Sequence, residues 1–144
     1  MIKISPRKRY NASSEGWVEY RGDSCVLNID PEIAKFYRAL LPKSYDIRPP
    51  KYPPHITIVR KFETPNENFK EKWYNGYYFK FYYGGPVKYN GVYYYLDCQS
   101  PGITKFRKEL GLPAYRFDDN KSYHITIGNS KKNDKEPIDN SSAP

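Results

Sequence analysis

The chain has 144 residues and a formal net charge of +8, and 17% of its residues are aromatic, with sixteen tyrosines. This length suits one domain with a real core, and we expect residues 1–144 to form it. No apolar run approaches the length of a membrane span, and the basic start of the chain lacks the apolar segment of a signal peptide. We therefore expect a cytoplasmic protein with no membrane partner.

Two interpretations of the basic, aromatic composition stay open: a partner with phosphates and bases, or an AT-rich genome that inflates Lys, Asn, Tyr and Ile. Cys25 and Cys98 lie in separate apolar patterns without C-x-x-C spacing, which predicts reduced, structural thiols. Two histidines and two isolated cysteines lack the usual spacing of zinc ligands. The expectation is no metal and no cofactor.

The first predicted element is a strand over residues 24–29, after about twenty polar and basic residues. Asp30 followed by Pro31 predicts an N-cap and the first position of a helix. Leu41-Pro42 ends this helix. Its buried stripe is predicted from apolar residues at helical spacing, namely Ile33, Phe36, Tyr37 and Leu40.

A proline-rich loop leads to a second strand, expected from His55 to about Phe62. A charged connection over residues 63–76, with a short helix near 68–73, precedes an aromatic strand over 77–83. The dipeptide Asn90-Gly91 is a strong signal for a two-residue hairpin turn between strands 87–89 and 92–98.

The next segment repeats the earlier order. Ser100-Pro101 predicts another helix start, and Gly111 with Pro113 predicts its end. The apolar stripe of this helix is predicted to be Ile103, Phe106 and Leu110. A loop then leads to a last strand at His124, and the polar residues 130–144 are expected to form a mobile tail or a lid. The order strand, Pro-started helix, loop, strand thus occurs twice, which predicts a pseudo-twofold arrangement.

Each repeat ends in the same motif, H-I-T-I, at 55–58 and 124–127, and these two copies contain both histidines of the chain. Side chains alternate along a strand, so His and Thr share one face and the two isoleucines share the other. The sequence therefore predicts a four-residue site, composed of His55, Thr57, His124 and Thr126.

Two histidines suit general acid–base catalysis, in which one imidazole accepts a proton and the other donates one. Threonine hydroxyls can hold the non-bridging oxygens of a phosphate, and the scheme requires no metal. A single H-x-T is more often a half-exposed polar face of a strand. Two copies that use every histidine favour the catalytic interpretation.

The pair of motifs resembles the signature of the 2H phosphoesterase superfamily, and the resemblance covers about residues 24–128. It implies an α+β, bilobal fold, with two pseudo-symmetric lobes whose antiparallel sheets line a central groove and whose helices lie outside. It also implies metal-independent cleavage of 2′,3′-cyclic or 2′-hydroxyl-bearing phosphodiesters by His55, Thr57, His124 and Thr126.

Within the superfamily, the chain is most similar to the phage (T4-type) anti-CBASS phosphodiesterases in length and sequence texture. This similarity implies cleavage of cyclic di- or trinucleotides such as cyclic GMP–AMP in a host cytoplasm, through a 2′,3′-cyclic phosphate. Four further residues are candidates for substrate binding, although packing or surface exposure explains each equally well. Three are possible base platforms and one is a possible phosphate ligand: Trp17, Tyr20, Trp73 and Lys61.

Three alternatives stay open. An enzyme that acts on RNA ends, as a 2′,3′-cyclic phosphodiesterase or ligase-like protein, would use the same four residues. A sponge that binds nucleotides without cutting them needs no histidine chemistry. A basic RNA-binding module predicts salt-sensitive binding without turnover. No protein partner is implied by any of them.

Overall fold

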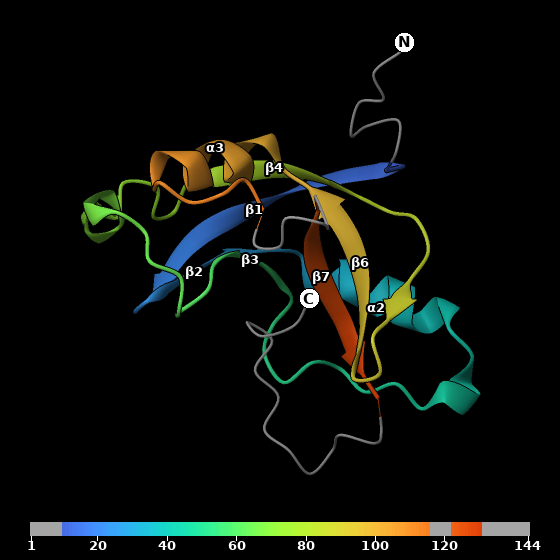
Figure 1. The fold of residues 1–144 in the computed structure, drawn as a ribbon. Helices are drawn as coiled ribbons and strands as arrows, with labels where there is room; N and C mark the ends of the chain where they lie inside the picture. The colour runs from blue at the N-terminus through green and yellow to red at the C-terminus, as the bar shows by residue number, and fades with distance from the viewer. Residues whose placement is uncertain (1–9, 116–121, 131–144) are drawn as a thin grey trace.

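The computed structural model describes residues 10–115 and 122–130, and its fold is built around one antiparallel sheet (Figure 1). The strands are β1 (Ala12–Arg21), β2 (Ser24–Asn28), β3 (His55–Val59), β4 (Tyr78–Tyr83), β5 (Lys88–Tyr89), β6 (Tyr93–Gln99) and β7 (Tyr123–Asn129). Their order is β4-β1-β2-β3-β7-β6-β5, and a further pairing of β4 with β6, at Tyr83 and Cys98, closes the sheet on itself.

Two α-helices and two short 3-10 helices complete the described part, and the predicted α+β class is confirmed. The α-helices are α2 (Pro31–Leu40) and α3 (Pro101–Glu109), and the 3-10 helices are η1 (Lys43–Tyr45) and η2 (Glu67–Glu71). Helix α2 lies against β7, and α3 lies against β4 and β3 (Figure 1). No helix among the described residues is long and apolar enough to cross a bilayer.

The predicted duplication is present in the element order, because β2–α2–β3 and β6–α3–β7 follow the same sequence of elements. The two units meet where β3 pairs with β7, and there Ile56 lies opposite Ile125. These residues occupy the same position of the two H-I-T-I motifs, so a local twofold relates β3 to β7 and β2 to β6. The division into two lobes stays a prediction.

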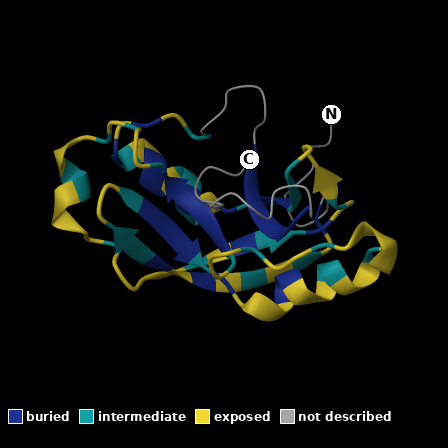
Figure 2. Cartoon of the chain, turned by 90° about the horizontal axis from the view of Figure 1, so that it is seen from below, coloured by how far each residue is buried: buried dark blue, intermediate teal, exposed yellow. Residues whose placement is uncertain are grey.

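The core lies on one face of the sheet, where one apolar residue from each of five neighbouring strands forms a continuous row. Each of these side chains is fully buried and lies opposite the next across a strand pair: Val18, Leu27, Ile56, Ile125 and Leu96. Figure 2 shows the buried residues concentrated in the central strands, with exposed residues on the outer surface of the helices. This row belongs to a larger core cluster that also includes Phe81, Ile103 and Phe106, whose burial stabilises the fold.

Both predicted helix starts are confirmed. The Asp30 side chain accepts a hydrogen bond from the N–H of Glu32, and the Ser100 hydroxyl accepts one from the N–H of Ile103. The predicted stripe of α3 is also correct, since Ile103, Phe106 and Leu110 are all buried.

The predicted stripe of α2 is partly wrong. Ile33 is buried, but Phe36 and Leu40 are 59% and 63% exposed, and Ala34 is buried instead. The face of α2 that lies against β7 also carries a polar contact, in which the Arg38 guanidinium donates to the carbonyl of Ile127 at 2.7 Å.

Strand β1 was not predicted, because its sequence is mostly small and polar. It nevertheless lies inside the sheet, between β4 and β2. Gly16 is needed there, because a Cβ at this position would lie 2.3 Å from the backbone oxygen of Asn28. At this position the backbone of β1 packs directly against the backbone of β2, without a side chain between them.

Three smaller boundaries also differ from the predictions. Strand β3 ends at Val59 rather than near Phe62, and the helix expected near residues 68–73 is the 3-10 helix η2. In the hairpin, the Asn90 side chain accepts hydrogen bonds from the N–H groups of Val92 and Tyr93, so the turn extends beyond Asn90-Gly91. The predicted tail lies, from residue 131 on, outside the described residues.

Candidate active site

The four motif residues lie on the face of the sheet opposite the apolar row that contains Ile56 and Ile125. His55, Thr57, His124 and Thr126 are between 5% and 7% exposed. Extending the Ile56–Ile125 register by one residue in each direction places His55 opposite Thr126, and Thr57 opposite His124. Each imidazole therefore lies beside the hydroxyl of the other motif, and the role of these four residues stays a prediction.

The loop before β3 fixes the orientation of His55. Its Nδ1 lies 2.9 Å from the carbonyl oxygen of Pro53. A carbonyl oxygen only accepts, so Nδ1 carries the hydrogen, and in the neutral ring Nε2 then holds the lone pair. This tautomer makes Nε2 the atom of His55 that can accept a proton.

A polar network on β1 and β2 flanks His55. Asn28 lies opposite His55 and donates to the Glu19 carboxylate at 3.1 Å. Arg21 donates to the same Glu19 oxygen and to the Asn28 side chain, at 2.8 and 3.0 Å. These hydrogen bonds, first the one from Asn28 and then the one from Arg21, lower the pKa of Glu19.

A carboxylate flanks His124. Asp97 on β6 lies opposite His124, and its Oδ1 is 3.5 Å from Nε2 of the imidazole. Asp97 is 8% exposed, forms an ion pair with Lys88, and accepts a hydrogen bond from the Ser122 hydroxyl at 3.4 Å. The ring of Tyr95 meets the His124 ring edge to face, with centroids 5.1 Å apart.

A cavity of about 280 Å³ opens beside His55, close to the lower end of the usual range for ligand pockets. Its lining comes from the end of β1, from β2, and from the two loops around β3: Arg21, Asp23, Ser24, Val26, Tyr52, His55 and Lys61. Of the four weaker candidates from the sequence, Lys61 is therefore next to a motif residue. Two cationic groups, one carboxylate and one aromatic ring line this cavity with His55.

The other three candidates lie elsewhere. Trp17 is on the motif face of β1, opposite Asn28, and is 42% exposed. Tyr20 points to the core face, where its ring packs against Phe69 and Phe106, with centroids 5.3 and 6.2 Å away.

Trp73 follows η2 and is exposed, and the hydroxyl of its neighbour Tyr74 donates to Glu109 of α3. Neither Tyr20 nor Trp73 lines the cavity beside His55.

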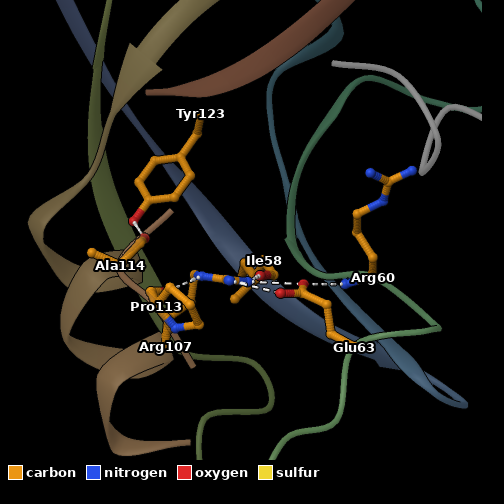
Figure 3. A network of polar contacts seen from close by, with 7 residues as sticks. All are labelled: Ile58, Arg60, Glu63, Arg107, Pro113, Ala114 and Tyr123. Atoms are coloured by element: carbon orange, nitrogen blue, oxygen red, sulfur yellow. Dashed lines mark hydrogen bonds and ion pairs between the residues drawn. The ribbon is translucent and has the colours of Figure 1, made fainter. Parts of the chain in front are cut away.

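A buried ionic network anchors the motif strand to α3 (Figure 3). The fully buried Arg107 donates to the carbonyl of Ile58 at 2.6 Å and to the carbonyl of Pro113 at 2.8 Å. It also donates to both carboxylate oxygens of Glu63, at 3.0 and 2.7 Å. Glu63 in turn accepts from the N–H of Arg60. The network anchors the C-terminal end of β3, where the sequence predicted that the strand continues to about Phe62.

Several site residues were not predicted from the sequence. Asp97 is the one charged residue in β6 (Tyr93–Gln99). An isolated charge in an apolar strand is a signal for a functional residue, but it points to His124 only when the partner strand of β6 is known. Arg21 and Tyr52 lie in segments without regular periodicity.

Cys25 and Cys98 are buried free thiols, as predicted, and burial raises the pKa of both. Within residues 10–115 and 122–130, no three His, Cys, Asp or Glu residues form a cluster that could hold a metal ion.

Comparison with known proteins gives one match. The family model of the Swiss Army Knife 2H phosphoesterase domain matches residues 30–135, a range that contains both H-I-T-I strands and both Pro-started helices. No curated protein and no solved structure matches the chain significantly.

Proposed function

The chain belongs to the 2H phosphoesterases, and we propose that it cleaves cyclic di- or trinucleotides to linear products without a metal. The observation that carries the proposal is the alternation of imidazole and hydroxyl across β3 and β7, centred on the Ile56–Ile125 pair. Two imidazoles and two hydroxyls on one face are the groups that an in-line displacement at a phosphodiester needs.

In the proposed reaction, one motif histidine removes the proton from a ribose 2′-OH. The 2′ oxygen then forms a bond to the adjacent phosphorus as the bond from phosphorus to the 5′ oxygen breaks. The other histidine gives its proton to the departing 5′ oxygen, and the products are a 2′,3′-cyclic phosphate and a free 5′-OH. Thr57 and Thr126 donate hydrogen bonds to the non-bridging oxygens. Water then opens the cyclic phosphate by the reverse transfer of protons.

The cavity beside His55 supports a substrate with more than one phosphate. Lys61 places positive charge in this cavity, and Tyr52 adds an aromatic ring. Arg21 is paired with Glu19, and the carboxylate of Asp23 also lines the cavity. A cyclic dinucleotide has a second phosphate and two bases, and stacking on an aromatic ring contributes about 1–3 kcal/mol per base. The net charge of +8 favours the approach of such an anion. The biological role that we propose is phage counter-defence against CBASS immunity, by removal of its cyclic nucleotide signal.

Incubation with a panel of cyclic di- and trinucleotides tests the proposal, with mass analysis of the products. We expect linear products from ribose substrates, none from 2′-deoxy analogues, and no effect of EDTA. Loss of activity with EDTA would contradict the metal-independent scheme.

RNA with a 2′,3′-cyclic phosphate end is the comparison substrate. Preferential turnover of this RNA would assign the protein to RNA-end processing instead. Tight binding of cyclic nucleotides that survives in both His55→Ala and His124→Ala, without any cleavage in the parent protein, would identify a sponge.

A further inference from the structure

The local twofold of the sheet is broken beside the two motif histidines. Asn28 lies opposite His55 on β2, and Asp97 lies opposite His124 on β6. The two positions are equivalent, because each pairs with the first residue of an H-I-T-I motif. An uncharged amide thus flanks one imidazole and a carboxylate flanks the other.

The carboxylate is well placed to act on His124. Its Oδ1 is 3.5 Å from Nε2, and Asp97 is nearly buried, where charge–charge interactions are stronger than in water. An opposite charge at this distance favours the protonated form of an imidazole. An imidazolium carries a proton on each ring nitrogen, and Nδ1 of His124 is buried. Nε2, the nitrogen that faces Asp97, is therefore the atom whose proton can pass to a leaving group.

No carboxylate lies directly opposite His55 in the strand pairing, where its partner is Asn28. The Nδ1–H of His55 donates to the carbonyl of Pro53, which leaves Nε2 as the acceptor in the neutral ring. The nearest carboxylate of this network, Glu19, lies one strand further away on β1, and its interaction with His55 is the smallest of the causes that lower the pKa of Glu19. There Glu19 already accepts hydrogen bonds from Arg21 and Asn28, and the cationic Arg21 offsets its charge.

We propose that Asp97 is a positioning residue that holds His124 in the protonated state, which makes His124 the general acid and His55 the general base. This assignment rests on the proposed phosphodiesterase function. The 2′-OH proton passes to Nε2 of His55, and the proton of the His124 imidazolium passes to the departing 5′ oxygen. The next turnover requires that both protons exchange back, which opening of the cyclic phosphate by water accomplishes.

Other groups around His124 set the size of the effect. Tyr95 on β6 and Thr57 on β3 are uncharged neighbours, and Ser122 donates to Asp97. Lys88 on β5 pairs with Oδ2 of Asp97, the carboxylate oxygen other than the one near His124, and its side chain is 45% exposed. The positive charge of Lys88 repels that of the imidazolium. Removal of Lys88 therefore increases the stabilisation of protonated His124 by Asp97.

Proton NMR tests the charge effect without any substrate, because the chain has only two histidines and gives two ring resonances to titrate. In Asp97→Asn, we expect the titration midpoint of His124 to fall by about 1 pH unit or more. In Lys88→Gln, the same resonance titrates at higher pH than in the parent. The His55 resonance moves much less in both variants. Shifts that are absent, equal for both histidines, or in the same direction in the two variants would overturn the proposal.

A second measurement assigns the acid and the base. A substrate whose departing 5′ oxygen is replaced by sulfur needs no acid, because a thiolate leaves unprotonated. With the oxygen substrate, His124→Ala loses about 10²–10⁴-fold in rate and Asp97→Asn about tenfold. With the sulfur substrate, both variants recover to near the parent rate, and His55→Ala stays slow. Rescue of His55→Ala instead would reverse the assignment.

The two experiments separate the possible failures. If the parent protein cleaves neither substrate, the proposed function is wrong, and the NMR titration still decides whether Asp97 controls the charge of His124. If the parent cleaves both and Asp97→Asn behaves like the parent throughout, the proposal is wrong and Asp97 serves only as the partner of Lys88 and Ser122. Circular dichroism of each variant establishes that its fold is intact.

Discussion

Ile56 and Ile125 lie opposite one another where β3 pairs with β7, and each is the second residue of an H-I-T-I motif. Both side chains are fully buried in the central row of the core. The register that packs these isoleucines also fixes which imidazole lies beside which hydroxyl on the other face. The geometry of the candidate site therefore follows directly from the packing of the core.

The motif residues give the first prediction. His55→Ala and His124→Ala should each lower kcat by about 10²–10⁴-fold, because each removes one proton transfer from a concerted step. The double variant should be little slower than the single variants, since the two residues act as a unit. Initial rates with the cyclic dinucleotide that the parent cleaves best measure the effect.

The threonines extend this test. Thr57→Val and Thr126→Val should each lower kcat by about 10²-fold, the usual cost of losing one donor to a charged transition state. Thr64→Val is the matched control, because Thr64 is exposed and lies beyond the end of β3. A double histidine variant that retains the parent rate would contradict the role of this site.

The cavity beside His55 gives the second prediction. Lys61→Gln should raise KM for a cyclic dinucleotide several-fold, roughly the effect of one partly solvated ion pair, with kcat little changed. The effect should be smaller at high salt, because Lys61 is exposed.

A mononucleotide 2′,3′-cyclic phosphate, which has no second phosphate, should be cleaved equally by the parent and the variant. Lys35→Gln on α2 is the control for net charge, since it removes an exposed charge outside this cavity. An equal rise of KM in both lysine variants would point to general electrostatic attraction rather than to a phosphate contact.

The sequence was most informative where local chemistry alone determines structure. Asp30-Pro31 and Ser100-Pro101 cap helices in any context, and strand alternation alone separates His and Thr from Ile. The helix caps and the alternation along each strand could be predicted without knowing how the strands pair. The four-residue site needed one further assumption, that the two copies of the motif lie side by side.

The sequence was least informative where function or stability depends on partners far along the chain. Strand β1 carries few apolar residues, and it is held by pairing with β2 and β4. Asp97 becomes a neighbour of His124 only through the β6–β7 register, and Arg107 meets Glu63 across 44 positions of sequence. A single sequence does not contain these registers, because they are set by the tertiary fold.

The Arg107–Glu63 pair gives the third prediction. Glu63→Gln leaves the fully buried guanidinium opposite a neutral amide, and we expect the free energy of unfolding to fall by about 3–5 kcal/mol. Lys105→Ala is the matched control, because it removes an exposed ion pair with Glu109 on the same helix. That variant should cost about 0.5 kcal/mol or less.

Urea unfolding of the parent and both variants measures the difference, and an unchanged m-value would show that the unfolded states are comparable. Similar small losses in the two variants would mean that Arg107 keeps its stabilising contacts through the carbonyls of Ile58 and Pro113 alone.

Buried tyrosines give the fourth prediction, a loss of stability at alkaline pH. Burial is the main cause that raises the pKa of Tyr20 to about 12, and it also raises the pKa of Tyr123. In the unfolded chain these phenols ionise near their ordinary value of about 10. Above that pH the unfolded chain therefore loses protons that the folded chain retains, and stability falls as the pH rises toward about 12.

Urea unfolding at about pH 8 and about pH 11 should show this fall, with the folded chain keeping both phenols protonated through most of the range. Tyr20→Phe should flatten the pH dependence, because phenylalanine has no proton to lose in either state. Tyr78→Phe is the control: Tyr78 is 67% exposed, so its substitution should leave the dependence unchanged. If the Tyr20→Phe variant loses as much stability between these two pH values as the parent does, the phenol of Tyr20 is not the group that destabilises the fold, and its ring contributes only through its packing against Phe69 and Phe106.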